Sequence, residues 1–344
     1  MAGRFWKAQP ASAIADNGSG KCRVTVASTT GMTTGDSRLF FSFTGTTGLN
    51  GQQTITVIDG THLDVTAVSF VATGTGSING YWNGSNTNNW VSSSGGTDYG
   101  QTVPGSSDNV TFDGSSGGGT VTLNLGGSLT ILSLGLGAFT GTWDNSVNNN
   151  NITATASSNA FNLSGSGTRT IKLGTATYTA TSSSGSWAMG TVTNLTFQGD
   201  SATIAFTNNL GGKTFRGGGK TYGTLSVAAQ SGNSLLSILD TNTFGSLSIT
   251  APCCIELTTG AVTTVSNPIS IVGSSSNQIG FLPSANNSNS DLALASGSTF
   301  QWCAFRGVAF SGSPSITNSF NLGNNSGATI NGPTGGGALI GMVG

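Results

Sequence analysis

A short apolar pattern recurs in the second half of this chain at a fixed spacing. The segment Tyr222-Gly-Thr-Leu225-Ser-Val227 returns as Phe244-Gly-Ser-Leu247-Ser-Ile249, with the same 22-residue offset at every apolar position. Equivalent residues stack on successive turns when a chain coils with such a period, which is typical of a parallel β-solenoid. The repeat therefore predicts coils whose apolar residues face inward.

A weaker copy of the pattern, Val192-Thr-Asn-Leu195-Thr-Phe197, precedes the first at a longer offset, from Leu195 to Leu225. Leucine-rich repeats have similar periods and a similar Leu-x-x-Leu-x-Leu pulse. The residues between the pulses are Gly, Ser, Thr, Asn and β-branched types, which favour strands and turns over helix. We therefore expect a β-solenoid, with about nine or ten coils in the region 120–330 at this period.

The composition is typical of a folded β-protein. Only 7% of the 344 residues are charged and 54 are glycine, yet 35% are hydrophobic. A Gly/Ser/Thr/Asn tract without apolar residues could not offset its chain entropy, whereas apolar residues recur here from end to end. The expected fold class is all-β, with a small N-terminal β-module followed by a parallel β-solenoid (β-helix).

Shifts in composition divide the chain into five segments. We expect an N-terminal arm (1–12), a small β-module (13–78), a Trp/Asn/Gly-rich transition or cap (79–119), the solenoid (120–330) and a Gly-rich C-terminal tail (331–344).

Aromatic residues precede the expected solenoid, and Asn-rich loops recur along it. Trp82, Trp90 and Phe112 are large enough to cover one end of the β-body. The loops at 148–151, 286–287 and 324–325 suit tight turns, because Asn tolerates left-handed geometry.

The β-module should contain four strands separated by Gly-containing turns. These strands cover residues 24–26, 39–43, 54–58 and 62–66. A three-residue loop at 59–61 would pair Val57 with Leu63, whereas a two-residue turn would place Val57 opposite the polar His62. We therefore expect the three-residue loop, with Ile55 opposite Val65, Gly60 near the left-handed region, and His62 and Asp64 sharing the polar face.

Nucleophile-and-base chemistry has little support. The only histidine, His62, lies on the predicted hairpin, where we expect a solvated strand residue. Residues 211–214 (Gly-Gly-Lys-Thr) resemble the end of a phosphate-binding loop, but Thr207 stands where such a loop requires glycine. We expect no enzyme activity and no catalytic residue.

Metal and cofactor signatures are weak as well. The four cysteines are Cys22, Cys253, Cys254 and Cys303, and they contain no Cys-x-x-Cys pair. We expect them to be buried as small hydrophobic residues, with a disulfide as the alternative. Asp98, Asp108 and Asp113 lack Ca²⁺-loop spacing, so we expect them to cap turns. We expect no metal and no cofactor.

Two routes to carbohydrate recognition remain open. Glycoside hydrolysis needs two carboxylates about 5 to 9.5 Å apart. The predicted solenoid has five candidates: Asp144, Asp200, Asp240, Glu256 and Asp291. None of them are related by the 22-residue offset that would stack them on neighbouring coils. Aromatic stacking on a host glycan is the second route, through Trp143, Trp187 or Trp302, although tryptophans at such positions more often lie in a core or cap.

Charge and hydropathy limit the partners. The 11 basic residues are scattered and the formal net charge is −1, so we expect no nucleic-acid partner. No apolar run approaches the ~18 residues of a membrane span, and the first ten residues lack the apolar core of a secretory signal. We expect synthesis in a cytoplasm without Sec export.

Several segments carry a resemblance to proteins of tailed bacteriophages. The segments 13–26, 30–36, 48–51 and 55–64 resemble a small β-module of phage virion proteins. The later segments 82–112, 213–215, 242–247 and 318–327 are similar to phage and prophage β-helical structural proteins.

The resemblance implies a virion structural protein, such as a tail fibre, spike or decoration component. It implies other virion proteins as partners, a homo-oligomer with a trimer favoured, contact with a host surface glycan, and release from the host by lysis. A polysaccharide-depolymerising tailspike and a bacterial surface adhesin remain the alternatives, the latter requiring an export signal.

Overall fold

The structure is a computed structural model that describes residues 2–80, 82–83, 87, 89–199, 201–286 and 288–334. Within these residues the chain forms β-strands and one short 3-10 helix, Thr47–Leu49, which confirms the all-β fold class. No helix in these ranges is long and apolar enough to cross a membrane. The expectations for Asp200, Asn287 and residues 335–344 of the tail fall outside the described residues.

The chain divides into two compact units. Unit 1 comprises Met1–Asn150, Gly165–Lys172 and Thr193–Thr196. Unit 2 comprises Asn151–Ser164, Leu173–Val192 and Phe197–Gly344. Each unit is described by itself.

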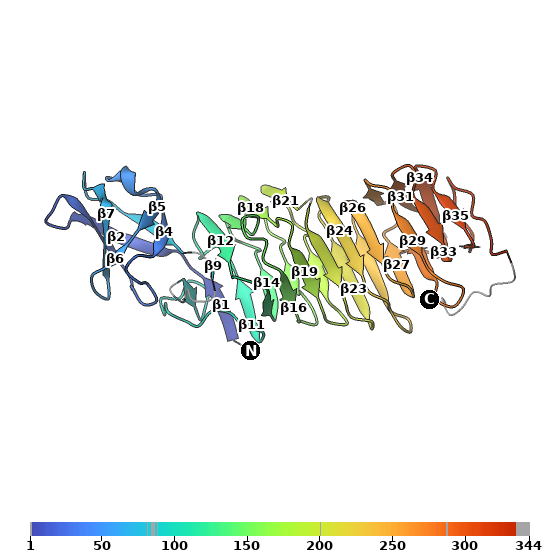
Figure 1. The fold of residues 1–344 in the computed structure, drawn as a ribbon, viewed down its shortest axis with the longest axis horizontal. Helices are drawn as coiled ribbons and strands as arrows, with labels where there is room; N and C mark the ends of the chain where they lie inside the picture. Colours follow the sequence, from blue (N-terminus) through green and yellow to red (C-terminus); the bar gives the residue numbers. More distant parts are fainter. Residues whose placement is uncertain are drawn as a thin grey trace. The chain divides into compact units, whose positions relative to one another are not determined.

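The β-module in unit 1 is a seven-stranded antiparallel sheet with the order β5-β4-β8-β2-β3-β7-β6 (Figure 1). Its strands are β2 (Gln9–Asp16), β3 (Lys21–Val26), β4 (Ser37–Phe41), β5 (Gly51–Thr54), β6 (Thr56–Val57), β7 (His62–Ser69) and β8 (Gly76–Asn79). Apolar residues alternate along them, so that Val24, Phe40 and Leu63 are fully buried in one core. The strands β2 and β8 were not expected from the sequence.

The hairpin between β6 and β7 has the expected register but not the expected glycine. Val57 pairs with Leu63, which confirms the three-residue loop. The expectation for Gly60 was wrong, because its φ is not positive. The carboxylate of Asp59 instead accepts the backbone N–H groups of Thr61 and His62, both at 2.8 Å. This side-chain turn reverses the chain without a left-handed residue.

Unit 1 also contains parallel strand ladders. One ladder joins β1 (Ala2–Trp6), β11 (Asp108–Thr111) and β14 (Ser133–Gly135), with β10 (Trp90–Val91) antiparallel to β1. The other joins β9 (Trp82–Asn83), β12 (Thr120–Asn124), β15 (Thr142–Asp144) and β18 (Arg169–Lys172). The segment 1–12, expected as an arm, therefore supplies β1 and the start of β2, and parallel pairing begins before residue 120.

The aromatic residues expected to form a cap are buried together in unit 1. Trp6, Trp82, Trp90 and Phe112 are each at most 1% exposed. Trp90 meets both other tryptophans edge-on, with ring centroids 5.1 Å from Trp6 and 5.3 Å from Trp82. Edge-to-face contacts suit the quadrupoles of the rings, so these residues close the core rather than present a surface.

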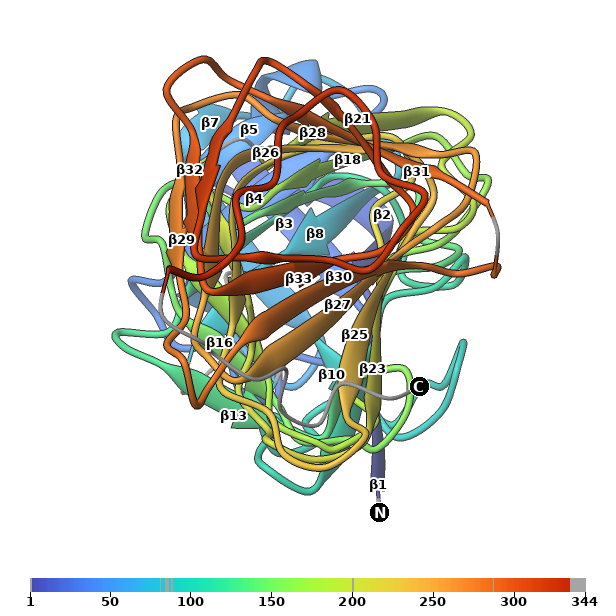
Figure 2. The same cartoon turned by 90° about the vertical axis from the view of Figure 1, so that its right-hand side faces the viewer.

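Unit 2 is a parallel β-solenoid, and three ladders form its walls (Figure 2). The first contains β16 (Ile152–Ala154), β19 (Thr177–Ala180), β22 (Thr203–Phe206), β24 (Thr221–Val227), β26 (Asn242–Ile249), β28 (Val262–Val265), β31 (Ser290–Leu294) and β34 (Val308–Ser311). The second contains β17 (Phe161–Asn162), β20 (Ser186–Ala188), β23 (Gly212–Arg216), β25 (Leu235–Leu239), β27 (Cys253–Leu257), β30 (Ile279–Pro283), β33 (Cys303–Phe305) and β36 (Phe320–Asn321). The third contains β29 (Ser270–Val272), β32 (Thr299–Gln301) and β35 (Ser315–Thr317).

The 22-residue repeat stacks as expected. Leu225 of β24 pairs in register with Leu247 of β26, as Tyr222 does with Phe244. The weaker copy around Leu195 does not join this ladder, because β21 (Leu195–Gln198) belongs to another sheet. The partner of Leu225 on the preceding coil is instead Ile204.

The coils vary in length around the 22-residue period of the sequence. The chain between register partners is longer from Tyr178 to Ile204 than from Ile204 to Leu225. It is longer again from Thr263 to Leu292. The structure has about eight turns instead of nine or ten. Extra residues at the corners lengthen a coil without changing the strand register inside.

Candidate functional site

The three tryptophans considered for glycan stacking lie in different environments. Trp143 is fully buried in unit 1, and Trp187 is 1% exposed in unit 2, where its Nε1 donates to the Tyr222 hydroxyl at 3.1 Å. Stacking on a sugar requires an accessible ring face, which neither residue has. Trp302 is partly exposed and has a φ of 55°, an uncommon conformation for a bulky residue.

Two of the carboxylates considered for hydrolysis, Asp240 and Glu256, each accept hydrogen bonds from the preceding coil. Asp240 accepts the backbone N–H groups of Gly217 and Gly218, both at 3.2 Å. Glu256 accepts the Ser237 hydroxyl at 2.6 Å, and these two residues are register partners. Asp240 follows the end of β25 and lies three positions after Ser237, the register partner of Glu256, so the two carboxylates come from different register positions of the ladder.

Asp144 is committed to an ion pair in unit 1. Its carboxylate lies 3.0 Å from Lys172 Nζ and accepts the Ser146 hydroxyl at 2.6 Å. Burial opposes ionisation, but the hydrogen bonds from Ser146 and Lys172 outweigh it and lower the pKa of Asp144. Asp291 pairs through its backbone with Val262 and has an exposed side chain.

The Gly-Gly-Lys-Thr segment is part of a strand and not a phosphate loop. Lys213 is 0% exposed, and its Nζ donates to the carbonyl oxygens of Leu210 at 2.6 Å and Gly211 at 3.3 Å. Burial lowers the pKa of Lys213. The ammonium group therefore closes its own turn and offers no donor to an anion.

Asp98, Asp108 and Asp113 act as turn caps, as expected. Asp98 accepts the N–H of Ser92, Asp108 that of Gly105 and Asp113 that of Ser115. Across the described residues no group of three or more His, Cys, Asp or Glu side chains could hold a metal ion.

The cysteines are free thiols in mostly buried positions. Cys22, Cys253 and Cys303 are buried, whereas Cys254 is half-buried. Neighbouring strand residues point to opposite faces, which explains the difference between Cys253 and Cys254.

His62 and Asp64 lie on the polar side of β7. His62 Nδ1 is 2.9 Å from Asp59 Oδ2. Asp64 accepts Arg23 Nε at 2.7 Å and Asn17 Nδ2 at 3.1 Å. The hydrogen bond from Arg23 lowers the pKa of Asp64. This cluster joins the β2–β3 turn to β7 and has a structural role.

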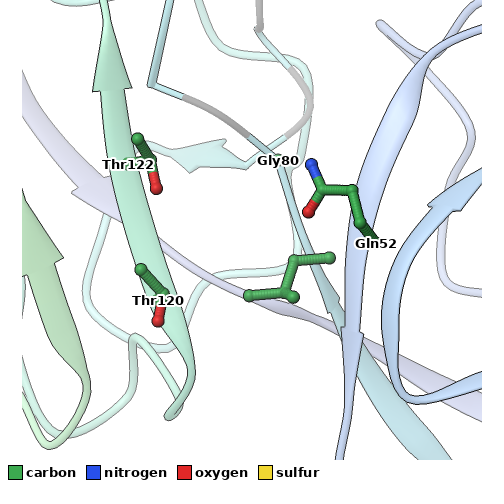
Figure 3. A pocket seen from close by; sticks show the side chains of 5 residues that line it. Gln52, Gly80, Thr120 and Thr122 are labelled. Carbon is green, nitrogen blue, oxygen red and sulfur yellow. The ribbon is translucent and has the colours of Figure 1, made fainter. Parts of the chain in front are cut away.

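A small pocket in unit 1 lies between the β-module and β12 (Figure 3). Leu39 and Gln52 border it from the module, and Thr120 and Thr122 from β12, with Gly80 between them. Its volume is about 180 Å³. The residues that line it include no ionisable side chain.

A larger pocket lies in unit 2, where the chain enters β25, β27 and β30 on three successive coils. Its volume is about 320 Å³. The lining consists of amides, hydroxyls, one proline, one glycine and two thiols: Gln230, Ser231, Gly232, Asn233, Ser234, Pro252, Cys253, Cys254, Ser276, Asn277 and Gln278. We call it the corner pocket.

Backbone hydrogen bonds hold the three corners of this pocket together. Gln230 N donates to Pro252 O at 2.6 Å, and Cys253 N donates to Gln278 O at 3.2 Å. Ile279 N donates to Trp302 O at 3.3 Å, which places the Trp302 backbone at the corresponding corner of the next coil. Of the three tryptophans, the structure thus brings only Trp302 beside the corner pocket.

Gln230 has the most unusual environment in the corner pocket. Its side chain is 5% exposed, and its Oε1 accepts Cys254 N at 3.1 Å. Its Nε2 has no hydrogen-bond acceptor within the described chain. A buried amide donor without a partner costs free energy, which marks it as a candidate ligand group.

Sequence reasoning missed this pocket. Its residues come from three separate stretches of the chain, and each corner alone is an ordinary polar turn. The one available signal is that Gln230 begins and Gln278 ends a polar run directly before strands of the same ladder.

Comparison with known proteins finds no match: no family model fits the chain, and no curated protein or solved structure is significantly similar.

Proposed function

We propose that this chain is a structural component of a tailed-bacteriophage particle, namely a fibre, spike or decoration protein. The observation that carries the proposal is the solenoid of unit 2. Many of the strand positions that face outward from its walls carry hydroxyl side chains instead of charged ones. Thr177, Thr203, Thr224 and Ser246 form one such outward column on four successive strands. A ladder with continuous backbone hydrogen bonds and few charges suits a rigid external scaffold.

The two β-architectures suit two tasks. The antiparallel module is a separate sheet with its own core, which fits a docking element for other virion proteins. The solenoid would form the part exposed to the host, with contact to a surface glycan. We also propose a homo-oligomer, with a trimer favoured, because strand ladders present open edges that association can cover.

The depolymerase alternative receives less support from the site. Asp240 and Glu256 each satisfy local hydrogen bonds and are offset along the ladder. The surface adhesin alternative is equally consistent with the solenoid. It differs from the virion proposal in where the chain is attached, which would be the bacterial envelope.

The location of the chain tests the proposal. Particles released by lysis from cells that express the gene should carry the chain at fixed stoichiometry, visible by mass spectrometry and by immunogold labelling on intact particles. A lysate of the same cells without particles is the control. Recovery of the chain only as a free monomer in the host cytoplasm would overturn the virion proposal, and recovery on the bacterial envelope would favour the adhesin.

Light scattering coupled to size exclusion tests the oligomer separately. A trimer mass is the expected result, and a monomer at all concentrations would contradict it.

A further inference from the structure

We propose that the corner pocket of unit 2 binds an uncharged saccharide unit. The inference deepens the proposed contact with a host glycan, and its biological role rests on that function. The binding itself can be measured on the purified chain whether or not the chain is found in a particle.

The buried Gln230 amide is the first argument. Its Oε1 is engaged by Cys254 N, so the orientation of the amide is fixed and the Nε2 end remains without an acceptor in the described chain. The side chain is 5% exposed and borders the pocket. The Nε2 atom itself is buried, so a ligand hydroxyl reaches this donor when the Gln230 side chain shifts toward the pocket, and it then supplies the acceptor that the described chain does not provide.

The chemistry of the lining is the second argument. Side-chain amides and hydroxyls both donate and accept, which matches the hydroxyl groups of a sugar. None of the residues that line the pocket carries a charge. Phosphate, sulfate or carboxylate ligands would lose their hydration here without a cation among the lining residues to compensate, so an uncharged ligand fits best.

The size of the pocket is consistent with a small ligand. Its volume of about 320 Å³ is at the lower end of ligand pockets in proteins. It equals the volume of about ten water molecules in the liquid, which is adequate for one or two sugar rings and too small for a longer chain to be enclosed.

The Trp302 backbone lies next to the corner pocket, on the following coil. It is hydrogen-bonded to Ile279, directly after the pocket residue Gln278. Its positive φ is an unfavourable conformation for a bulky side chain, and such conformations persist at ligand sites. Pro252, exposed at the middle corner, adds an apolar surface. Saccharide sites in general combine polar groups with apolar surfaces of this kind.

The direct test uses four neutral tetrasaccharides, one each of glucose, galactose, mannose and N-acetylglucosamine. Their binding to the full chain is measured by saturation-transfer NMR and calorimetry. Sulfated dextran fragments serve as the anionic comparison. We expect at least one neutral saccharide to bind and the anionic fragments to bind at least tenfold more weakly. Absence of binding by all four neutral probes at millimolar concentration would overturn the inference, as would equal binding of the sulfated fragments.

Two variants locate the binding. Asn277→Ala removes an exposed amide from the lining, and about a fivefold loss of affinity is expected. Gln230→Glu keeps an oxygen for Cys254 N but removes the donor, and about a tenfold loss is expected. Asn286→Ala, beyond the other end of β30, is the matched control and should bind like the wild type. Unchanged affinity in both pocket variants would exclude this pocket.

Tryptophan fluorescence gives an independent readout. The other five tryptophans are at most 1% exposed: Trp6, Trp82, Trp90, Trp143 and Trp187. A saccharide-dependent change in fluorescence should therefore come from Trp302. The signal should disappear in Trp302→Phe, and its persistence would contradict placement of the ligand at this edge.

The two proposals fail in distinguishable ways. A chain that binds saccharide but is missing from particles would contradict the proposed function alone. A chain that is present in particles but does not bind would contradict this inference alone.

Discussion

Three of the eleven basic side chains of this protein are buried: Arg38, Arg169 and Lys213. Lys213 places its ammonium group against two carbonyl oxygens of its own turn, and Arg169 Nη1 donates to the carbonyls of Gly165 and Gly167. Both residues are at most 2% exposed. Since corner carbonyls cannot all join a ladder, a long cation with several donors satisfies them where the chain turns.

Replacing Lys213 tests this role. Lys213→Met keeps the length of the side chain but leaves the carbonyls of Leu210 and Gly211 without their donor. We expect a loss of about 1–3 kcal/mol in the free energy of unfolding, measured by urea denaturation. Lys220→Met, which removes a half-exposed lysine, should change stability by less than about 0.5 kcal/mol. A Lys213→Met variant as stable as the wild type would contradict the role.

Buried thiols make the stability depend on alkaline pH. Burial raises the pKa of Cys303 to about 12, against 9.0 for an unperturbed thiol. Burial likewise raises the pKa of Cys253 to about 12 and of Cys254 to about 11. Above pH 9 the unfolded chain releases protons that the native state retains. Stability is therefore complete below about pH 9 and falls as pH rises toward 12.

Cys303→Ala should reduce this slope. One thiol titrating only in the unfolded state contributes about 1.4 kcal/mol per pH unit, so urea midpoints from pH 8 to 11 should fall less steeply in the variant. Val308→Ala is the control. It truncates a fully buried side chain that lies close to Cys303 in the sequence and carries no titratable proton, so this variant should keep the wild-type slope. An identical slope in Cys303→Ala would show that its thiol ionises in the native state.

At the scale of elements, stability comes from apolar residues stacked on successive coils. Leu225 and Leu247 are register partners on β24 and β26, with 1% and 5% exposure. Strands in a sheet are about 4.8 Å apart, so the two side chains share one layer of the core. Each coil therefore buries its apolar face only in the presence of its neighbours.

Truncating these leucines tests the stacking. Leu225→Ala and Leu247→Ala should each cost about 2–5 kcal/mol, measured by thermal or urea unfolding. Because the residues adjoin, the double variant should depart from additivity by at least about 0.5 kcal/mol. Ser248→Ala, at the exposed position next to Leu247, is the control and should be nearly neutral. Strict additivity of the two leucine variants would contradict direct stacking.

At the scale of the whole molecule, electrostatics contributes little. With 7% charged residues and a net charge of −1, the chain has three ion pairs of Arg or Lys with Asp, and a His62–Asp59 contact, among the residues that the structure describes. Partly exposed ion pairs contribute little to stability and are screened by salt. A scaffold of this kind depends on burial and backbone hydrogen bonds, which salt affects weakly.

The stability of the protein should therefore respond little to ionic strength. Between 0.05 and 0.5 M NaCl we expect the free energy of unfolding to change by less than about 1 kcal/mol, measured by urea denaturation at pH 7. Arg23→Gln, which removes the ion pair with Asp64, should make the response smaller still. A change above about 2 kcal/mol would show that long-range charge interactions contribute more than these contacts indicate.

The sequence by itself determined the features that depend on local pattern. The 22-residue offset specified which residues stack on two successive coils, because the same types of side chain recur at the same positions, and Leu225 and Leu247 are partners as expected. Matching apolar residues across a short loop likewise specified the pairing of Val57 with Leu63. In both cases burial of one face leaves a single acceptable register.

Only the tertiary structure decided the features that depend on packing between distant segments. Gly60 is not left-handed because the Asp59 carboxylate stabilises the turn. Individual coils differ in length at their corners, which no fixed period conveys. The corner pocket exists because three corners are stacked by the ladder, and Gln230 lies in it through its contacts with Pro252 and Cys254. Such a site has no local signature, since each of its parts is an ordinary turn until the coils bring them together.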